Sequence, residues 1–338
     1  TNFGLTANFF FFCFSVDADY YTRDTEDAVI SIQVPLVGQT VRRSLGVIRN
    51  SGFELAMNWS NKISDDFSYN IGFNISTLKN EVLDLYGQEY INGGSAEFRQ
   101  RTIVGESLLA FYGWETNGIY QSWDEINSDP IAVENGLEPG DFRYKDQQAE
   151  GEEGHGIIDG EDRVILGSYL PRLTYGGNLG IRYKNLELSA SVFGQSGNKI
   201  LNRRRGEIIW TPDLNMDADL AKNRTQIQLD EENNVVSVVK PGKYPSSKAL
   251  RKGWNQRMSD YLVEDGSFFR IQNVQLAYHV DGGQTFGAGM PDFKVTLTAE
   301  RPLTFFNYNG FNPEVHDGID RQTYPIPSVY TVGLNVNF

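Results

Sequence analysis

The feature that most constrains the fold is a strict alternation of apolar and polar residues over long segments of the chain. From residue 53 to 60, Phe, Leu, Met and Trp occupy every second position, with Glu, Ala, Asn and Ser between them. The alternation resumes at 67–76 and returns at 186–192, 293–300 and 330–338. Successive side chains of a β-strand point to opposite faces, so a period of two predicts strands with one apolar and one polar face.

Two architectures contain such strands, the soluble β-sandwich and the membrane β-barrel. Strands of soluble proteins average about five or six residues, whereas the repeats here run to about 10, the length of a tilted strand that crosses a bilayer. The polar positions hold small uncharged residues as often as charged ones, and aromatic residues lie near the strand ends, as in the girdles of membrane barrels. We therefore predict an all-β fold, a transmembrane antiparallel β-barrel in an outer membrane.

The composition excludes several other classes of protein. The mean hydropathy is −0.41, and no apolar run approaches the roughly 18 residues that a membrane-spanning helix needs. A barrel remains compatible with this value, because its strands interleave apolar and polar residues. The 44 acidic against 30 basic residues argue against a nucleic-acid binder, since phosphate binding relies on clustered Lys and Arg. The single cysteine, Cys13, excludes a disulfide scaffold.

Alternation and turn residues together predict about eleven strands. These strands cover residues 6–21, 27–36, 48–61, 65–78, 97–104, 109–120, 173–183, 186–197, 268–281, 291–302 and 328–338. Around Asn273 the apolar residues shift from odd to even positions, so that Ile271 and Val274 cannot both obey one alternation. This shift predicts a β-bulge there. Long connections are predicted at 37–47, 79–96, 121–172, 198–267 and 303–327. Outer-membrane barrels have short periplasmic turns and long extracellular loops, so we assign all the long connections to the extracellular side.

The predicted number of strands is odd, whereas bacterial single-chain barrels normally have an even number. About eleven strands alone would leave two unpaired edges, and unpaired backbone groups are costly in hydrocarbon. We therefore predict that residues 1–338 form only part of a barrel and that its N-terminal strands lie outside this chain. The alternative is a self-contained barrel of about ten or twelve strands, which requires the segment 328–338 to pair with 6–21.

Short motifs also occur in a fixed order along the chain. Residues 49–55 read RNSGFEL, 118–122 read GIYQS and 139–146 read PGDFRYKD. Further motifs lie at 20–27, 105–113, 171–177, 194–197, 265–278 and 324–338. Each motif is weak alone, but their order and spacing over nearly the whole chain resemble the C-terminal half of SusC/RagA-like TonB-dependent transporters. These are outer-membrane channels of Bacteroidetes that import glycans or peptides.

The resemblance implies a barrel of about 22 strands, a plug domain that is absent from this chain, and energy from the TonB complex acting through the missing N-terminal part. It also implies a SusD-like surface lipoprotein that covers the extracellular loops and a glycan or peptide substrate. A passive porin or structural barrel is the alternative. An outer-membrane enzyme would need clustered catalytic residues, and the sequence offers only scattered acids and three distant histidines, His155, His279 and His316.

The acidic segment at 146–162 is the part of the chain whose residues most suggest a metal-binding site. In the family this region is similar to a calcium loop, in which carboxylate and carbonyl oxygens surround the ion. By that resemblance Asp146, Asp159 and Asp162 are the candidate ligands, although His155 replaces an expected acid and residues are inserted between the matching positions. The alternative is a solvated acidic loop that binds no ion.

Aromatic and basic residues in the long loops are candidates for substrate contact. The aromatic candidates, which could stack on sugar rings or anchor a lid, are Tyr112, Trp114, Trp123, Trp210 and Trp254. The basic candidates, which could reach a substrate carboxylate, are Arg203, Arg204 and Arg205. The alternatives are girdle or loop packing for the aromatic residues and salt bridges for the arginines.

Overall fold

A computed structural model describes most of the 338 residues. Outside the description are residues 12, 34–39, 95–97, 211–214, 217, 252, 288, 322 and 338, together with the side chains of 30–33, 40–43, 45, 207–210 and 251. All statements below concern the remaining residues. Among them, no helix is both long enough and apolar enough to cross a bilayer.

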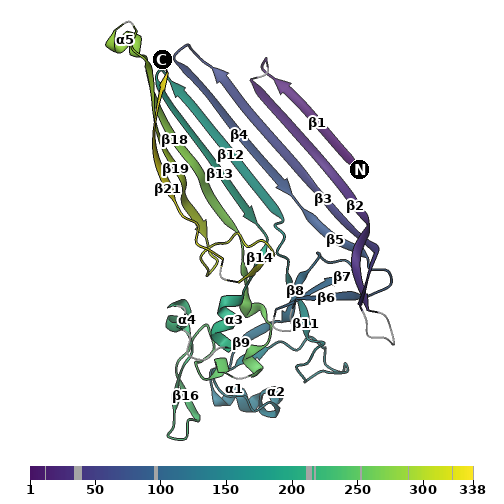
Figure 1. The fold of residues 1–338 in the computed structure, drawn as a ribbon. Helices are drawn as coiled ribbons and strands as arrows, with labels where there is room; N and C mark the ends of the chain where they lie inside the picture. The colour runs from purple at the N-terminus through teal and green to yellow at the C-terminus, as the bar shows by residue number, and fades with distance from the viewer. Residues whose placement is uncertain are drawn as a thin grey trace.

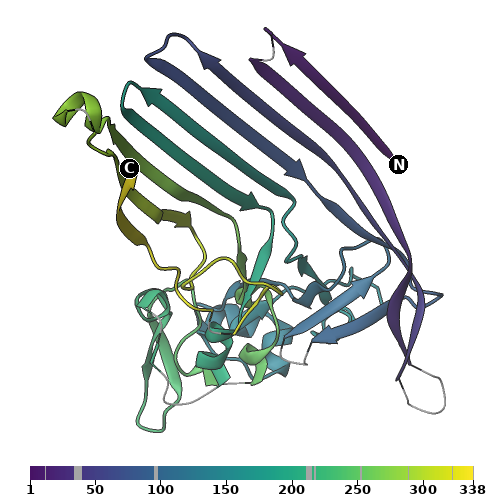
Figure 2. The ribbon, with the colours of Figure 1, turned by 45° about the horizontal axis from the view of Figure 1, so that its top comes forward.

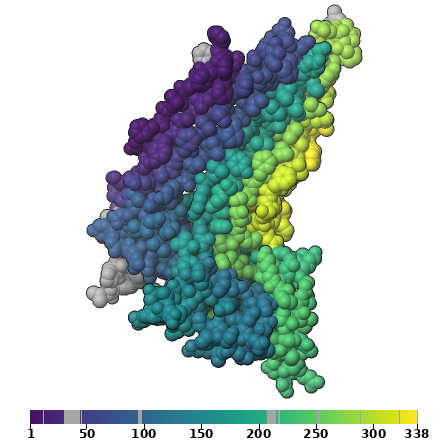
Figure 3. Space-filling model, turned by 180° about the vertical axis from the view of Figure 1, so that it is seen from behind, coloured from purple at the N-terminus to yellow at the C-terminus, as the bar shows by residue number. Residues whose placement is uncertain are grey.

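One large antiparallel sheet, here the main sheet, dominates the structure (Figures 1 and 2). In spatial order its strands are β1 (Asn2–Phe9), β2 (Phe14–Gln33), β3 (Thr40–Lys62), β4 (Phe67–Thr77), β12 (Leu173–Tyr183), β13 (Leu186–Ser196), β18 (Phe268–Val280), β19 (Asp292–Phe306) and β21 (Val329–Asn337). A short strand, β5 (Lys79–Asp84), pairs with the first half of β3. The space-filling view from behind shows the strands packed side by side as a continuous wall (Figure 3). The prediction of an all-β, barrel-like fold is confirmed.

The strand register brings apolar residues of neighbouring strands into continuous rows on one side, the apolar face of the main sheet. One row consists of Trp59, Ile71, Leu179, Ala190, Val274, Ala299 and Tyr330. The next row, which is shifted by one residue along each strand, lies on the opposite, polar face. It consists of Asn70, Gly180, Ser189, Gln275, Thr298 and Thr331. Apolar side chains remain exposed on the first face, as with Leu297 at 50% and Val332 at 76%. A soluble protein would have to cover such a surface.

Aromatic side chains border the apolar face at both ends of the strands. At the end near the long connections, the ring of Phe269 stacks between Tyr175 at 6.4 Å and Phe305 at 6.2 Å. At the other end, Tyr183 meets Phe67 edge-on at 6.5 Å. Gly194 leaves room for the Tyr175 ring in the aromatic group near the long connections, because a β-carbon at Gly194 would lie only 2.4 Å from that ring. Two aromatic belts with aliphatic residues between them are typical of barrels that cross a membrane.

Both lateral edges of the main sheet are open in the described part of the chain. β21 pairs with β19 and β1 pairs with β2, and no pairing joins β21 to β1. The alternative of a self-contained barrel, which requires that pairing, is therefore wrong. The number of about eleven strands is not confirmed either. The described strands within the predicted segments 97–104 and 109–120 are Arg99–Ile103, Ala110–Trp114 and Thr116–Ile119, and they lie in two small sheets separate from the main sheet.

The predicted strand at 6–21 is also wrong, since it is a hairpin. Phe10 and Phe11 adopt left-handed φ values of 52° and 55°, and Phe9 pairs with Phe14 on the antiparallel strand that follows. β2 then runs through the predicted break at 22–26. The predicted bulge is confirmed, because the register shifts between Ile271 and Asn273.

The long connections gather at one end of the main sheet and form a packed unit, here called the loop region (residues 85–172, 197–267 and 307–328; Figure 1). Its strands are β6 (Tyr90–Gly94), β7 (Arg99–Ile103), β8 (Ala110–Trp114), β9 (Thr116–Ile119), β10 (Phe142–Tyr144), β11 (Arg163–Gly167), β14 (Lys199–Asn202), β15 (Gln226–Leu229), β16 (Val235–Lys240), β17 (Val263–Asp265) and β20 (Ile319–Asp320). Its helices are α1 (Trp123–Ser128), α2 (Pro130–Glu134), α3 (Arg203–Trp210) and α4 (Ala218–Asn223), with 3-10 turns at Ala249–Arg251, Gly253–Gln256 and Asp260–Leu262.

A shared core holds the three connections of the loop region together. Phe111 from the first, Leu201 and Leu262 from the second and Ile319 from the third pack in one buried cluster. Because these residues are far apart in sequence, the cluster makes the loop region a single folded cap rather than separate loops. That this end is extracellular stays a prediction.

Candidate functional site

Strand β8 carries two of the predicted substrate-contacting residues, Tyr112 and Trp114, on the same face because they are two residues apart. Tyr112 is buried, and the guanidinium of Arg101 lies 3.7 Å from its ring centre. The same guanidinium lies 3.8 Å from the ring of Tyr90, so Arg101 is sandwiched between two aromatic rings. A ring covered in this way is a packing partner and not an open platform for a sugar.

Trp114 is stacked in a similar way. The guanidinium of Arg163 lies 4.2 Å from its ring and that of Arg257 lies 5.1 Å away, while its Nε1 donates to the carbonyl of Asp159 at 2.7 Å. Arg257 also lies 4.3 Å from the ring of Trp254.

Burial among these rings lowers the pKa of Arg257, and Tyr144 and Asp162 nearby oppose the shift.

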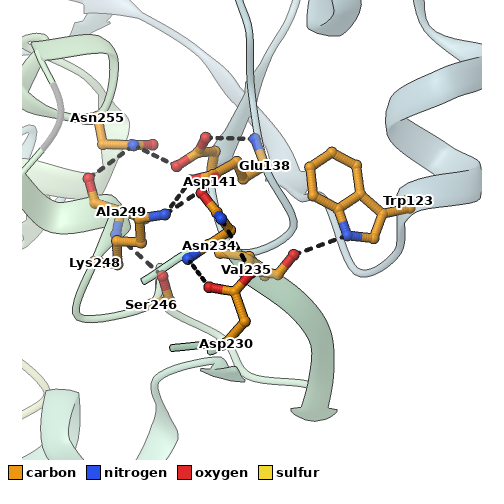
Figure 4. A network of polar contacts seen from close by, with 10 residues as sticks. All are labelled: Trp123, Glu138, Asp141, Asp230, Asn234, Val235, Ser246, Lys248, Ala249 and Asn255. Atoms are coloured by element: carbon orange, nitrogen blue, oxygen red, sulfur yellow. Dashed lines mark hydrogen bonds and ion pairs between the residues drawn. The ribbon is translucent and has the colours of Figure 1, made fainter. Parts of the chain in front are cut away.

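The other predicted contact residues lie on different elements. Trp123 begins α1, and its Nε1 donates to the carbonyl of Val235 at 3.1 Å, which ties α1 to the β15–β16 hairpin (Figure 4). Arg203 begins α3 with its guanidinium 5.4 Å from the ring of Phe98. Trp210 ends α3, and its side chain lies outside the described part. Of the predicted contact residues, Tyr112 and Trp114 share β8, and Arg203 and Trp210 share α3.

A buried polar network, which the sequence did not reveal, joins the PGDFRYKD motif to the second connection (Figure 4). The side chain of Asn255 donates to Asp141 Oδ1 and to the carbonyl of Ala249, both at 2.9 Å, and accepts from the backbone N–H of Phe142 at 2.7 Å. Lys248 Nζ donates to Glu138 Oε1 at 3.0 Å at the edge of the network. Three satisfied hydrogen bonds on one buried amide fix the relative position of two connections.

The loop region also contains a polar pocket of about 370 Å³. It is lined by Arg205, Asp219, Lys243, Tyr244, Glu264, Asp265, Asn307, Tyr308 and Asn309. The side chain of Arg205 is only 7% exposed, and its guanidinium lies 3.6 Å from Glu264 and 3.8 Å from Asp219. These distances are too long for strong hydrogen bonds. Within the described residues, Arg205 Nε and Asn309 Nδ2 are buried donors without a hydrogen-bond partner.

Phenol groups connect this pocket to neighbouring carboxylates. Tyr244 donates its hydroxyl to Asp219, and this hydrogen bond keeps the pKa of Asp219 below its ordinary value. Tyr308 donates to Asp320 at 2.6 Å, and burial raises the pKa of the Tyr308 phenol. The pocket therefore offers charges of both signs, hydroxyl groups and free buried donors, which suits a ligand rich in hydroxyl, amide or carboxylate groups.

In the acidic segment, two of the three predicted calcium ligands approach one another. One amide atom of Gln148 lies 2.6 Å from Asp162 Oδ1 and 3.0 Å from Asp146 Oδ1. With nitrogen at this position, the amide donates to both carboxylates. An oxygen at the same position would face only acceptors, so the nitrogen belongs there.

The fit to a calcium ion is only partial. The Asp159 side chain is exposed, and its Oδ1 accepts from the backbone N–H of Glu161 at 2.8 Å. Backbone N–H groups of Gln147 and Asp159 already donate to the two oxygens of Asp162, at 2.8 and 2.7 Å. In the part of the chain that the structure describes, no group of three His, Cys, Asp or Glu side chains is placed to hold a metal ion.

Comparison with known proteins identifies relatives in sequence and in fold. The chain is 29% identical to a TonB-dependent receptor of Formosa agariphila. The match covers 95% of this chain and 32% of that receptor. It is 24% identical to the TonB-dependent receptor SusC of Bacteroides thetaiotaomicron, again over 95% of the chain and 30% of the relative. No protein-family model matches the chain.

The fold is similar to that of a solved structure, the RagAB peptide importer in its open-open state. The TM-score is 0.75 at 22% identity, and the match covers 100% of this chain and 34% of the other. The chain thus spans about a third of the length of the proteins it matches. The predicted resemblance to SusC/RagA-like transporters and the outer-membrane location are confirmed.

Proposed function

We propose that this chain, which resembles TonB-dependent receptors of the SusC/RagA type, forms part of the channel wall and the extracellular cap of a nutrient importer. The observation that carries the proposal is the similarity to such receptors along 95% of the chain. The remaining strands, a plug domain and the contact with TonB would come from the rest of a longer protein. Pairing with those strands would satisfy the two open edges of the main sheet.

Oligosaccharides or peptides are the proposed substrates, and a SusD-like surface lipoprotein is the proposed partner. The pocket around Arg205 supports a substrate with many polar groups, because its walls offer carboxylates, phenols and free donors. The folded loop region supports the partner, since a rigid cap presents a defined surface to a second protein. The resemblance points to transport and not to catalysis.

Substrate depletion tests this function and separates it from a passive porin. Wild-type cells, cells without the gene and cells without TonB would each be given a mixture of oligosaccharides and a tryptic peptide digest. We expect wild-type cells to remove one class from the medium, as followed by mass spectrometry, and both mutants to leave it. Equal depletion by cells without TonB would favour a passive porin, and equal depletion by cells without the gene would refute an importer.

We also propose, from the resemblance to the family's calcium loop, that Ca²⁺ binds at the predicted ligands Asp146, Asp159 and Asp162. The carboxylates of Asp146 and Asp162 both lie within 3.0 Å of one amide atom of Gln148. Calcium should then raise the melting temperature of the loop region, and isothermal titration should show binding. Asp162→Asn should abolish both effects, because it removes a buried carboxylate. The matched control is Glu161→Gln, an exposed acid in the same segment. A titration without heat and without a thermal shift would leave the segment as an ion-free acidic loop.

A further inference from the structure

At the end of the main sheet opposite the loop region, the connection between β18 and β19 exposes large apolar side chains. It contains α5 (Gly282–Phe286) and continues to Pro291. Phe286 is 60% exposed and Met290 is 48% exposed. The neighbouring connection between β12 and β13 instead carries Lys184 and Asn185. Figures 1 and 3 show that α5 projects beyond the ends of the strands.

Hydrogen bonds hold this connection in a defined shape. The side chain of Asp281 accepts from the backbone N–H of Gln284 at 2.9 Å, and that of Asp292 accepts from Gly282 at 3.0 Å. Gly287 ends α5 at φ 113°, and its carbonyl accepts from the N–H of Met290 at 3.2 Å. A glycine suits this left-handed position because it lacks a β-carbon. The positions of Phe286 and Met290 are therefore set by the local fold.

The apolar surface of α5 continues the lipid-facing surface of the main sheet. The Phe286 ring meets the Phe293 ring edge-on, at 6.3 Å between centres. Phe293 pairs with Val280 on β18 and Val336 on β21, in the last apolar row of these strands. That row lies two residues beyond the one that contains Tyr278, or about 7 Å further along the strand. Phe286 thus lies just past the aromatic belt of this end.

We propose that α5 and Met290 form a lipid anchor in the headgroup–acyl boundary of the adjacent phospholipid leaflet. Interfacial segments bury apolar side chains about 5–10 Å into this boundary, which agrees with a position just beyond the belt. Gln284 lies two residues before Phe286, on the opposite side of a helical turn, and can face water. By the short-turn rule for outer-membrane barrels, this leaflet is the periplasmic one. The proposal depends on the membrane location of the sheet and not on what the channel carries.

Spin-label accessibility tests the anchor in the intact receptor in phospholipid nanodiscs. On a Cys13→Ser background, which removes the free thiol, single labels would be placed at Phe286→Cys, Met290→Cys and the matched control Gln284→Cys. Leu297→Cys on the apolar face serves as the lipid reference. We expect the ratio of oxygen to nickel-chelate accessibility to be several-fold higher at 286 and 290 than at 284, because oxygen concentrates in lipid.

Each other outcome overturns the anchor. Strong nickel-chelate access at 286 and 290 would mean that the connection stands in water. Low access to both reagents would mean that protein, and not lipid, covers it. The Leu297 label separates this failure from a wrong placement of the sheet, since a lipid-like signal at 297 alone refutes only the anchor.

Discussion

Replacing Leu179 by arginine is expected to destabilise the receptor in its membrane by about 2–4 kcal/mol, the cost of an arginine on the lipid face of a barrel near the bilayer midplane. Leu179 lies between Ile71 and Ala190 in the row that crosses the main sheet. It is four residues from Tyr175 and four from Tyr183, which belong to the two aromatic belts. If the apolar face lies against lipid, an arginine there would be far from both interfaces.

The matched control is Ser189→Arg, because Ser189 precedes Ala190, the partner of Leu179, and therefore lies at the same depth on the polar face. We expect this variant to keep nearly the wild-type stability, since a polar lumen can hydrate a guanidinium. Urea unfolding in phospholipid vesicles measures both free energies, and heat-modifiable migration on gels gives the folded fraction. Equal losses in the two variants would contradict the assignment of the faces.

The two faces and the bulge could be predicted from the sequence because both depend on a local period of two. The hairpin at Phe9–Phe14 could not, because the tip is a run of phenylalanines without the Gly, Asn or Pro that usually marks a turn. The segments of β7 and β8 alternate only weakly, and these two strands pair within the loop region and not in the main sheet. Weak alternation predicts a strand without showing which sheet contains it.

The candidate site was less predictable, because its contacts join distant parts of the chain. Two aromatic residues on one strand, Tyr112 and Trp114, could be expected to share a face. That Arg101 and Arg257 would cover their rings depends on which loops meet in space. The pocket around Arg205 likewise combines residues of the second connection with Asn307, Tyr308 and Asn309 of the third.

Asn255→Leu is expected to unfold much of the loop region while leaving the main sheet intact. The substitution keeps a branched side chain with the same number of heavy atoms but removes its hydrogen bonds to Asp141, Phe142 and Ala249, residues up to 114 positions away in sequence. Each buried group left without a partner costs about 1–3 kcal/mol, more beside a charge, so a loss of about 3 kcal/mol or more is expected. The network joins two connections, and both should loosen together.

Limited proteolysis of the intact receptor measures this effect. Cleavage of Asn255→Leu within residues 121–172 and 198–267 should be many times faster than in wild type, while heat-modifiable migration of the barrel stays unchanged. Asn234→Leu is the matched control, because Asn234 is exposed and its side-chain amide donates to Asp230, close by in the same hairpin, at 3.0 Å. Such surface changes usually cost about 0.5 kcal/mol or less. Because the cap would be lost and the wall retained, import should fall although the receptor remains in the membrane. Wild-type resistance of Asn255→Leu to protease would show that the shared apolar core, and not this amide, holds the connections together.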